Sequence, residues 1–123
     1  YAPLYRHRMS LLGPDLHALG REIPLPSISA PALPASDAGL LGIIYAIEGS
    51  AHGGQIIAAH CRKVLGAAAA PAMRYVSELS PETGGNWEKI LQTLRCDLAC
   101  EADADQAALG AACVFDGLVA AAT

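Results

Sequence analysis

The most informative part of this sequence is Glu48-Gly-Ser-Ala-His-Gly-Gly-Gln55, which lies inside an apolar helical pattern running from Asp37 to Leu65. Each glycine inside a helix costs about 1 kcal/mol relative to alanine. Because the chain uses alanine freely elsewhere, the glycines at 49, 53 and 54 indicate a backbone that is kept bare. Either another group packs flat against this backbone, or the helix bends there.

These glycines belong to a stripe of small side chains on one face of the predicted helix. At helical spacing the stripe comprises Gly42, Ala46, Gly49 and Gly53, with Ser50 and Gly54 on the neighbouring line. A stripe of this kind makes a shallow groove, and the spacing alone favours close packing against another helix. The other interpretation is a flat apolar ligand that lies on the exposed carbonyls and amides.

Two segments precede the long helix. Residues 5–20 predict a helix that Pro14 interrupts, with its better-formed part starting near Gly13 and a stop at Gly20. Residues 21–36 form a connector whose four prolines exclude regular structure. The connector also contains the apolar residues Ile23, Leu25, Ile28 and Leu33. These residues predict that the connector lies on an apolar surface of the protein.

Local signals predict both ends of the long helix. Ser36 and Asp37 form a capping pair at its start, and Gly66 is the predicted C-cap. Beyond it, residues 71–79 predict a turn and one or two turns of helix.

Two starts are open for the next helix. Ser80-Pro-Glu has the order typical of a helix start, whereas Gly84 and Gly85 favour a later start near Asn86. The apolar side of this helix is formed by Trp87, Ile90, Leu91, Leu94 and Leu98.

A last helix is predicted over residues 103–121.

Composition narrows the class of protein. The chain has 123 residues, high aliphatic and low aromatic content, and a formal net charge of −4. These values predict a single all-α domain over residues 1–123 and argue against a nucleic-acid partner, since no basic cluster is present. Residues 111–122 are interrupted by Asp116 and are too short to span a membrane, so no membrane association is expected.

The four cysteines do not have the spacing of a structural zinc site. Cys96 and Cys100 are four residues apart and are predicted to share a helix face, from which they could hold a metal with Cys61 or a histidine. The preferred interpretation is four buried or half-buried thiols, including Cys113, in a reducing cytoplasm.

The segment Tyr45-Ala-Ile-Glu-Gly-Ser-Ala-His-Gly-Gly-Gln-Ile-Ile-Ala resembles the distal helix of the heme oxygenases. It is most similar to the bacterial, biliverdin-forming kind found beside phytochromes, in which Y-x-x-E-G-S-x-x-G-G recurs. The order of the surrounding segments agrees over nearly the whole chain. The resemblance implies a heme-oxygenase-like multi-helical bundle with a glycine-kinked distal helix.

In that family, heme is both cofactor and substrate. The resemblance implies oxidative opening of the heme ring to biliverdin, with release of CO and iron. It also implies O₂ and electrons from an external reductase or ferredoxin, and a bacteriophytochrome as a user of the product. The protein's part in such chemistry is to orient the heme and to supply a path for protons.

The resemblance also implies roles for particular residues. Ser50 would be the catalytic residue, because its hydroxyl can hold a water relay. Glu48 is expected to be a buried partner for a neighbouring helix. The heme-binding residues implied are Tyr45, Gly49, Gly53, Gly54 and Lys89.

Two departures from the family pattern matter. The family's iron-ligating histidine lies on a first helix upstream of the segment where this chain begins. The chain is therefore expected to lack its N-terminal helices, and no metal ligand is assigned in it. Beside Trp87, where relatives carry a basic residue for a heme propionate, this chain has Glu88, so Lys89 or Arg95 would serve.

None of the four histidines is assigned to iron. His52 is predicted to point away from the stripe and to lie on the surface or in packing, although it could reach the distal pocket. His60 is expected near the C-terminal end of the helix, and His7 and His17 in solvent.

Two alternatives to an enzyme stay open. One is a non-catalytic heme-oxygenase-like domain that acts in binding or as a scaffold. The other is an alanine-rich helical protein that uses its glycines for tight dimer packing.

Overall fold

The computed structural model describes residues 1, 4, 8–22, 32–78 and 80–122, the first six of the last range by their backbone alone. Every regular element in these residues is helical. The elements are α1 (Met9–Ala18), α2 (Asp37–Leu65), the 3₁₀ helix η2 (Gly66–Ala72), α3 (Arg74–Glu78), α4 (Ser80–Asp97) and α5 (Glu101–Ala122). The predicted all-α fold with a long kinked helix is confirmed.

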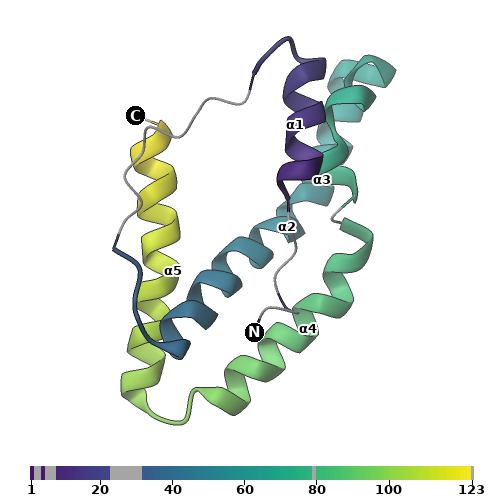
Figure 1. Cartoon of the computed structure of the whole chain (residues 1–123). Coiled ribbons are helices and arrows are strands. Elements are labelled where there is room, and N and C mark those ends of the chain that lie inside the picture. The colour runs from purple at the N-terminus through teal and green to yellow at the C-terminus, as the bar shows by residue number, and fades with distance from the viewer. Residues whose placement is uncertain (2–3, 5–7, 23–31, 79, 123) are drawn as a thin grey trace.

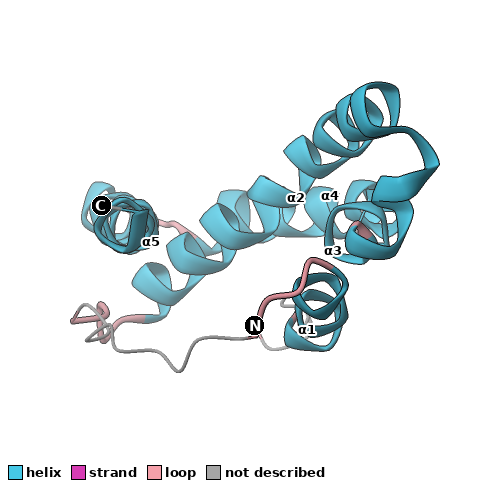
Figure 2. Cartoon of the chain, turned by 90° about the horizontal axis from the view of Figure 1, so that it is seen from above, coloured by secondary structure: helices cyan, strands magenta, loops and turns pink. Residues whose placement is uncertain are grey.

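The long helix α2 is the axis of the molecule (Figure 1). Its first half is crossed by α5, its middle packs against α4, and its far end contacts α3 and η2. The shorter α1 packs against η2 and α3 at that same far end (Figure 2). Each of α3, α4 and α5 therefore covers a different part of α2.

The predicted bounds of α2 are confirmed at both ends. The Ser36 hydroxyl oxygen accepts a hydrogen bond from the Gly39 amide at 3.0 Å and approaches Gln106 of α5 at 3.5 Å. At the other end Gly66 adopts a φ of 64°, a conformation that favours glycine, and the chain continues as η2. The helix itself is unbroken through the glycine motif.

The predicted start of α1 is wrong. Helix α1 begins at Met9 and not near Gly13, and Pro14 lies inside it. Helix α4 begins at Ser80, which confirms the first of the two starts that the sequence left open and excludes the later one near Asn86. There, the cost of two adjacent glycines is outweighed by the proline in the first turn and by packing of the following turns on α2.

The predicted stop of α1 is confirmed. The amide of Gly20 donates to the carbonyl of His17 at 2.9 Å, and the amide of Arg21 donates to that of Leu16 at 2.8 Å. With Gly20 at a φ of 67°, this is a Schellman cap.

The connector after α1 is described only in part. Residues 23–31, with Ile23, Leu25 and Ile28, lie outside the described residues. Leu33 is 58% exposed, so the prediction that the connector covers an apolar surface is wrong at that position.

The core lies where α4 and α5 meet α2. Leu41 of α2 and Ile90 of α4 are fully buried, which confirms the predicted apolar side of α4. Smaller buried side chains surround them, namely Ile44, Ala46, Ala51, Ala58, Met73 and Ala107. Because these side chains are small, the helices approach one another closely.

At the crossing of α2 and α5 the two backbones touch. A methyl group on Gly42 would fall on the backbone of Ala107, and one on Gly110 would fall on the carbonyl of Gly39. Close helix packing is therefore the correct interpretation for the first part of the glycine stripe.

The far half of α5 stands apart from the other helices (Figure 1). Leu109, Phe115, Leu118 and Val119 are all more than half exposed. By length and composition, and only by these, α5 is also the one described helix that could cross a membrane, at a mean hydropathy of 1.3. Residues 111–122, which are too short to span a membrane, form the second part of this longer helix.

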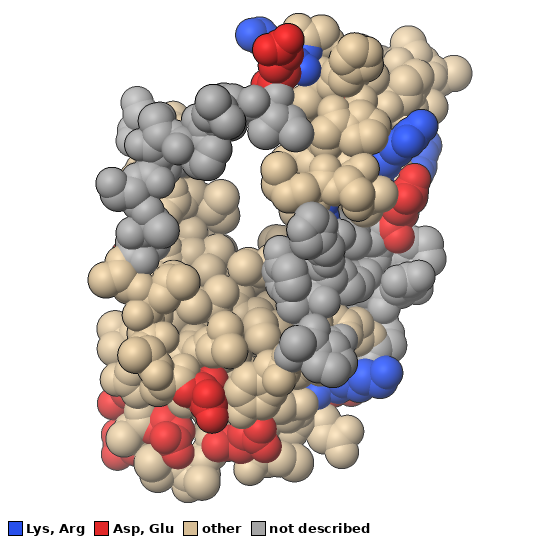
Figure 3. Space-filling model, in the orientation of Figure 1, with Lys and Arg blue, Asp and Glu red and all other residues tan. Residues whose placement is uncertain are grey.

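Acidic side chains gather at the end of the molecule where α5 begins (Figure 3). Glu101 and Asp103 lie in the first turn of this helix. Their negative charges stabilise the positive end of the helix dipole.

Replacing Gly42 with alanine should destabilise the protein. The added methyl would push α5 from α2, and overpacking of this kind costs about 1–3 kcal/mol. The matched control is Gly53→Ala, which meets no described atom within 4 Å and should stabilise the helix by about 0.5–1 kcal/mol. Urea unfolding measures both changes, and equal effects of the two variants would contradict the packing described.

Candidate functional site

A cavity of about 390 Å³ lies beside the second half of the glycine stripe. Its walls come from α2, from Trp87 of α4 and from Phe115 of α5. The lining residues on α2 are Tyr45, Ala46, Gly49, Ser50 and His52. The structure therefore brings the predicted residues Tyr45, Gly49 and Ser50 together in one cavity.

Trp87 covers Gly49. A methyl group on Gly49 would lie 3.0 Å from Cη2 of the indole, so the ring uses the space that the missing side chain leaves. The indole centroid lies 5.1 Å from that of Tyr45 and 4.9 Å from that of His52, whose ring meets it edge-on at 71°. Tyr45 and His52, one turn before and after Gly49, thus hold the indole in place.

Gly53 differs from the other glycines of the stripe. A methyl group on it would meet no described atom within 4 Å. A side chain at Gly42 would collide with the backbone of Ala107, and one at Gly49 would crowd Trp87. None of the described residues occupies the space beside Gly53 in this way. Gly53 lies one turn beyond Gly49 on α2 and is not among the residues that line the cavity.

Ser50 lies between two cavities. Its hydroxyl donates a hydrogen bond to the carbonyl of Ile47, one turn earlier, at 2.6 Å. The second cavity, of about 210 Å³, lies on the side of α3 and contains the buried Gly54 together with Tyr75 and Val76. Gly54 therefore faces a different space from Gly49.

Lys89 lies away from the glycine cavity. It is exposed and lines a separate groove of α4 with Thr93 and Cys96. Arg95 and Glu88 are also exposed. The structure does not bring Lys89 to Gly49, and its role toward a heme carboxylate stays a prediction.

Glu48 is the buried partner that the sequence predicted. It is 1% exposed, and its carboxylate lies 3.0 Å from the Arg8 guanidinium at the start of α1. Asn86 of α4 approaches the same carboxylate at 3.5 Å and also donates to the carbonyl of Leu4 at 2.9 Å. This cluster joins α1, α2 and α4 next to Gly49 and Trp87.

Asp15 has a structural role that the sequence reasoning missed. Its two carboxylate oxygens accept hydrogen bonds from the backbone amides of Arg74 and Tyr75, at 2.9 and 2.8 Å. A side chain of α1 thus caps the first turn of α3. The available signal was a carboxylate among the leucines of α1, which indicates a buried acid with a partner.

His52 does not point away from the stripe as predicted, since it lines the cavity with Gly49. It is nevertheless exposed and packed on Trp87, as the surface-or-packing expectation states. His17 and His60 are exposed, as expected, and His7 lies outside the described residues.

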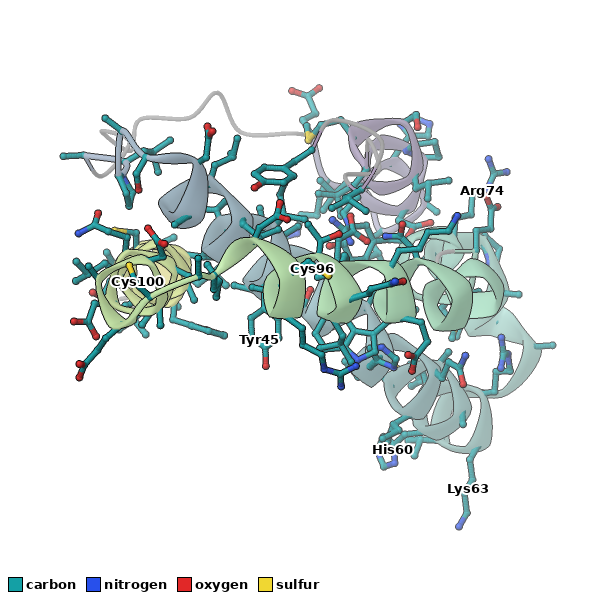
Figure 4. The ribbon with its side chains drawn as sticks, turned by 90° about the horizontal axis from the view of Figure 1, so that it is seen from below. Tyr45, His60, Lys63, Arg74, Cys96 and Cys100 are labelled. Atoms are coloured by element: carbon teal, nitrogen blue, oxygen red, sulfur yellow. The ribbon has the colours of Figure 1, made fainter. Side chains whose placement is uncertain are left out.

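The cysteine predictions hold only in part. Cys61 and Cys113 are half-buried, whereas Cys96 and Cys100 are exposed. Helix α4 ends at Asp97, so Cys100 lies beyond it, at the start of α5 (Figure 4). Within the described part of the chain, no three His, Cys, Asp or Glu side chains are grouped as they would be around a metal ion.

Removing the carboxylate of Glu48 should destabilise the protein strongly. Glu48→Ala removes the carboxylate that pairs with the buried Arg8 guanidinium, and breaking a buried ion pair in this way costs about 3–5 kcal/mol. Glu88→Ala, at an exposed position of α4, is the control and should change the free energy of unfolding by less than about 0.5 kcal/mol. A loss below about 1 kcal/mol for Glu48→Ala would contradict the account.

Adding a methyl group at Gly49 should move Trp87, which is the only tryptophan of the chain. We expect Gly49→Ala to shift the wavelength of tryptophan emission, because the indole must leave its place over the helix. Gly53→Ala adds the same group four residues later and should leave the emission unchanged. Identical spectra for Gly49→Ala and the wild type would show that Trp87 does not lie on Gly49 in solution.

Comparison with known proteins gives one informative match. No protein-family model matches the chain, and no solved structure matches it. The chain is 33% identical over 111 residues to the heme oxygenase of Xanthomonas campestris pv. campestris (strain 8004). The match covers 90% of this chain and 64% of that protein, so the chain spans less than two thirds of the relative's length. The chain is thus a distant homologue of a bacterial heme oxygenase, in agreement with the resemblance of its glycine motif.

Proposed function

We propose that this protein is a heme oxygenase, which opens heme to biliverdin with release of CO and iron. The observation that carries the proposal is the open backbone at Gly53, one turn of α2 beyond Gly49, which lines a cavity with aromatic side chains. Nothing among the described residues uses this glycine, so its cost to the helix is best explained by a ligand that lies against it. The distant homology to a bacterial heme oxygenase supports the same ligand.

The cavity suits a flat, largely apolar molecule. Its volume of about 390 Å³ lies within the range of about 300–1,000 Å³ typical of small-molecule sites. Tyr45, Trp87 and Phe115 offer ring surfaces for a planar macrocycle. The bare backbone at Gly53 lets such a plane approach the helix more closely than a side chain would allow.

When bound, heme supplies the iron and the ring that is oxidised, with O₂ and electrons from an external reductase or ferredoxin. The residues of this chain provide space for the ligand, exclude water and form hydrogen bonds. Gly53 leaves room over the helix, and Trp87 and Phe115 keep water from the apolar side. The Ser50 hydroxyl donates its hydrogen to the Ile47 carbonyl, so its oxygen is able to accept a hydrogen bond from a water molecule. We further propose a cytoplasmic protein whose product serves a bacteriophytochrome.

A specific observation favours a second candidate, a non-catalytic binding domain or scaffold. Trp87 covers Gly49, so half of the backbone that the resemblance assigns to heme is in contact with an indole. If Trp87 stays there, only the part near Gly53 is accessible to a ligand. Dimer packing through the first half of the stripe is less compatible with the structure, since α5 of the same chain covers Gly42.

Filling the space at Gly53 should abolish heme binding without unfolding the protein. Gly53→Leu projects a side chain into the space beside the cavity, where no described atom lies within 4 Å. We expect the absorbance change on titration with hemin to be lost, and biliverdin formation with a reductase to be lost with it.

The control is Ala59→Leu, the same size of side chain at an exposed position on a different face of α2. It should bind and turn over hemin as the wild type does, and circular dichroism should show that both variants are folded. Hemin binding without biliverdin in the wild type would favour the scaffold, and unchanged binding by Gly53→Leu would overturn the proposed site.

A further inference from the structure

The indole of Trp87 occupies part of the bare helix surface that a planar ligand would use. A methyl group on Gly49 would lie 3.0 Å from Cη2 of the indole and 3.2 Å from Cζ3, so one edge of the six-membered ring rests on the backbone. Carbon atoms in contact are already about 3.5–4.0 Å apart, which leaves no room for a second ring between the indole and the helix. A ligand can therefore contact Gly49 only after the indole has moved away.

The contacts that hold the indole in this place lie near the surface. The ring packs between Tyr45 and His52, at centroid distances of 5.1 and 4.9 Å. Tyr45 is 40% exposed, His52 is also exposed, and Trp87 itself is only half-buried. Within the part of the chain that the structure describes, no atom accepts a hydrogen bond from the indole N–H. Contacts among partly exposed side chains open at a smaller free-energy cost than contacts in the core.

The indole can move without disturbing the helix that carries it. Ile90, one turn later on α4, is fully buried and anchors this helix on α2. Trp87 also borders the glycine cavity, so a space of about 390 Å³ adjoins the ring. A change of side-chain rotamer is enough to take the indole off Gly49, and it requires no movement of the α4 backbone.

We propose that Trp87 is a displaceable cover of the glycine cavity. In the ligand-free protein its indole shields the backbone at Gly49, and a planar ligand reaches Gly49 only in a minor state in which the indole has rotated away. Opening exposes the bare backbone at Gly49 in addition to that at Gly53, which is already open. The identity of the ligand as heme rests on the proposed function, and the inference deepens that function by adding a control on access to the site.

The direct test follows the contact between the indole and Gly49 in solution. The full-length natural protein, labelled with ¹³C and ¹⁵N, is compared with and without gallium(III) protoporphyrin IX, a diamagnetic analogue of heme. The ligand-free protein should show a nuclear Overhauser effect between Hη2 of Trp87 and the Hα protons of Gly49. We expect this signal to disappear in the complex, because the porphyrin takes the place of the indole.

A second readout is the rate of hemin binding, followed by absorbance after rapid mixing. Trp87→Ala should accelerate association about tenfold, because an open state populated at about 10% limits binding to the wild type. The control is Leu118→Ala, which removes an exposed apolar side chain that does not line the cavity and should leave the rate unchanged. Circular dichroism should show that both variants are folded.

The outcomes separate the two claims. A wild-type protein that binds neither porphyrin overturns the proposed function, and the inference that rests on it falls as well. If the wild type binds gallium protoporphyrin while the contact between Trp87 and Gly49 persists, the inference alone is overturned. Absence of that contact from the ligand-free protein also overturns the inference alone, and so do equal association rates for the wild type and Trp87→Ala.

Discussion

The bare face of α2 is the constraint on which the rest of the structure depends. A helix that lacks side chains along one line must have its backbone covered by something flat or close. Here the cover changes along the stripe: the backbone of α5 at Gly42, the indole of Trp87 at Gly49, and open space at Gly53. The same sequence device therefore produces a helix crossing at one end and a cavity at the other.

Buried charges hold this arrangement in register. The Arg8–Glu48 pair, with Asn86 beside it, connects three helices at the residue that precedes Gly49. Asn86 directly precedes Trp87 on α4. The polar cluster therefore fixes the position along α2 at which the indole packs. A buried ion pair is weak evidence for stability, but the loss of either partner is costly, which ties the cavity to the integrity of the cluster.

How much of this could be predicted depends on the range of the interactions. The bounds of α2 were predictable because Ser36 and Gly66 act within one turn of the helix ends. The burial of Glu48 was predictable because an acid amid apolar residues needs a partner. The start of α4 was less certain because the local cost of glycine competes with packing that the sequence does not display.

The remaining features depend on contacts between distant segments. Trp87 lies on Gly49, which is 38 residues earlier, and Asp15 caps a helix that starts 59 residues later. Helical spacing alone placed His52 away from the stripe, whereas packing against Trp87 turns it into the cavity. Spacing on one helix defines a face, but the side chains that complete a site come from its neighbours.

The most direct test of the account is the position of hemin on the protein. Ferric iron broadens the NMR signals of nearby amides, so a ¹⁵N-labelled full-length protein can be compared with and without hemin. The account predicts that broadening centres on the amides of Gly49, Ser50 and Gly53, with little effect at Gly42 beneath α5. Broadening centred on the exposed face of α5 around Leu118, or no broadening at the glycine motif, would contradict it.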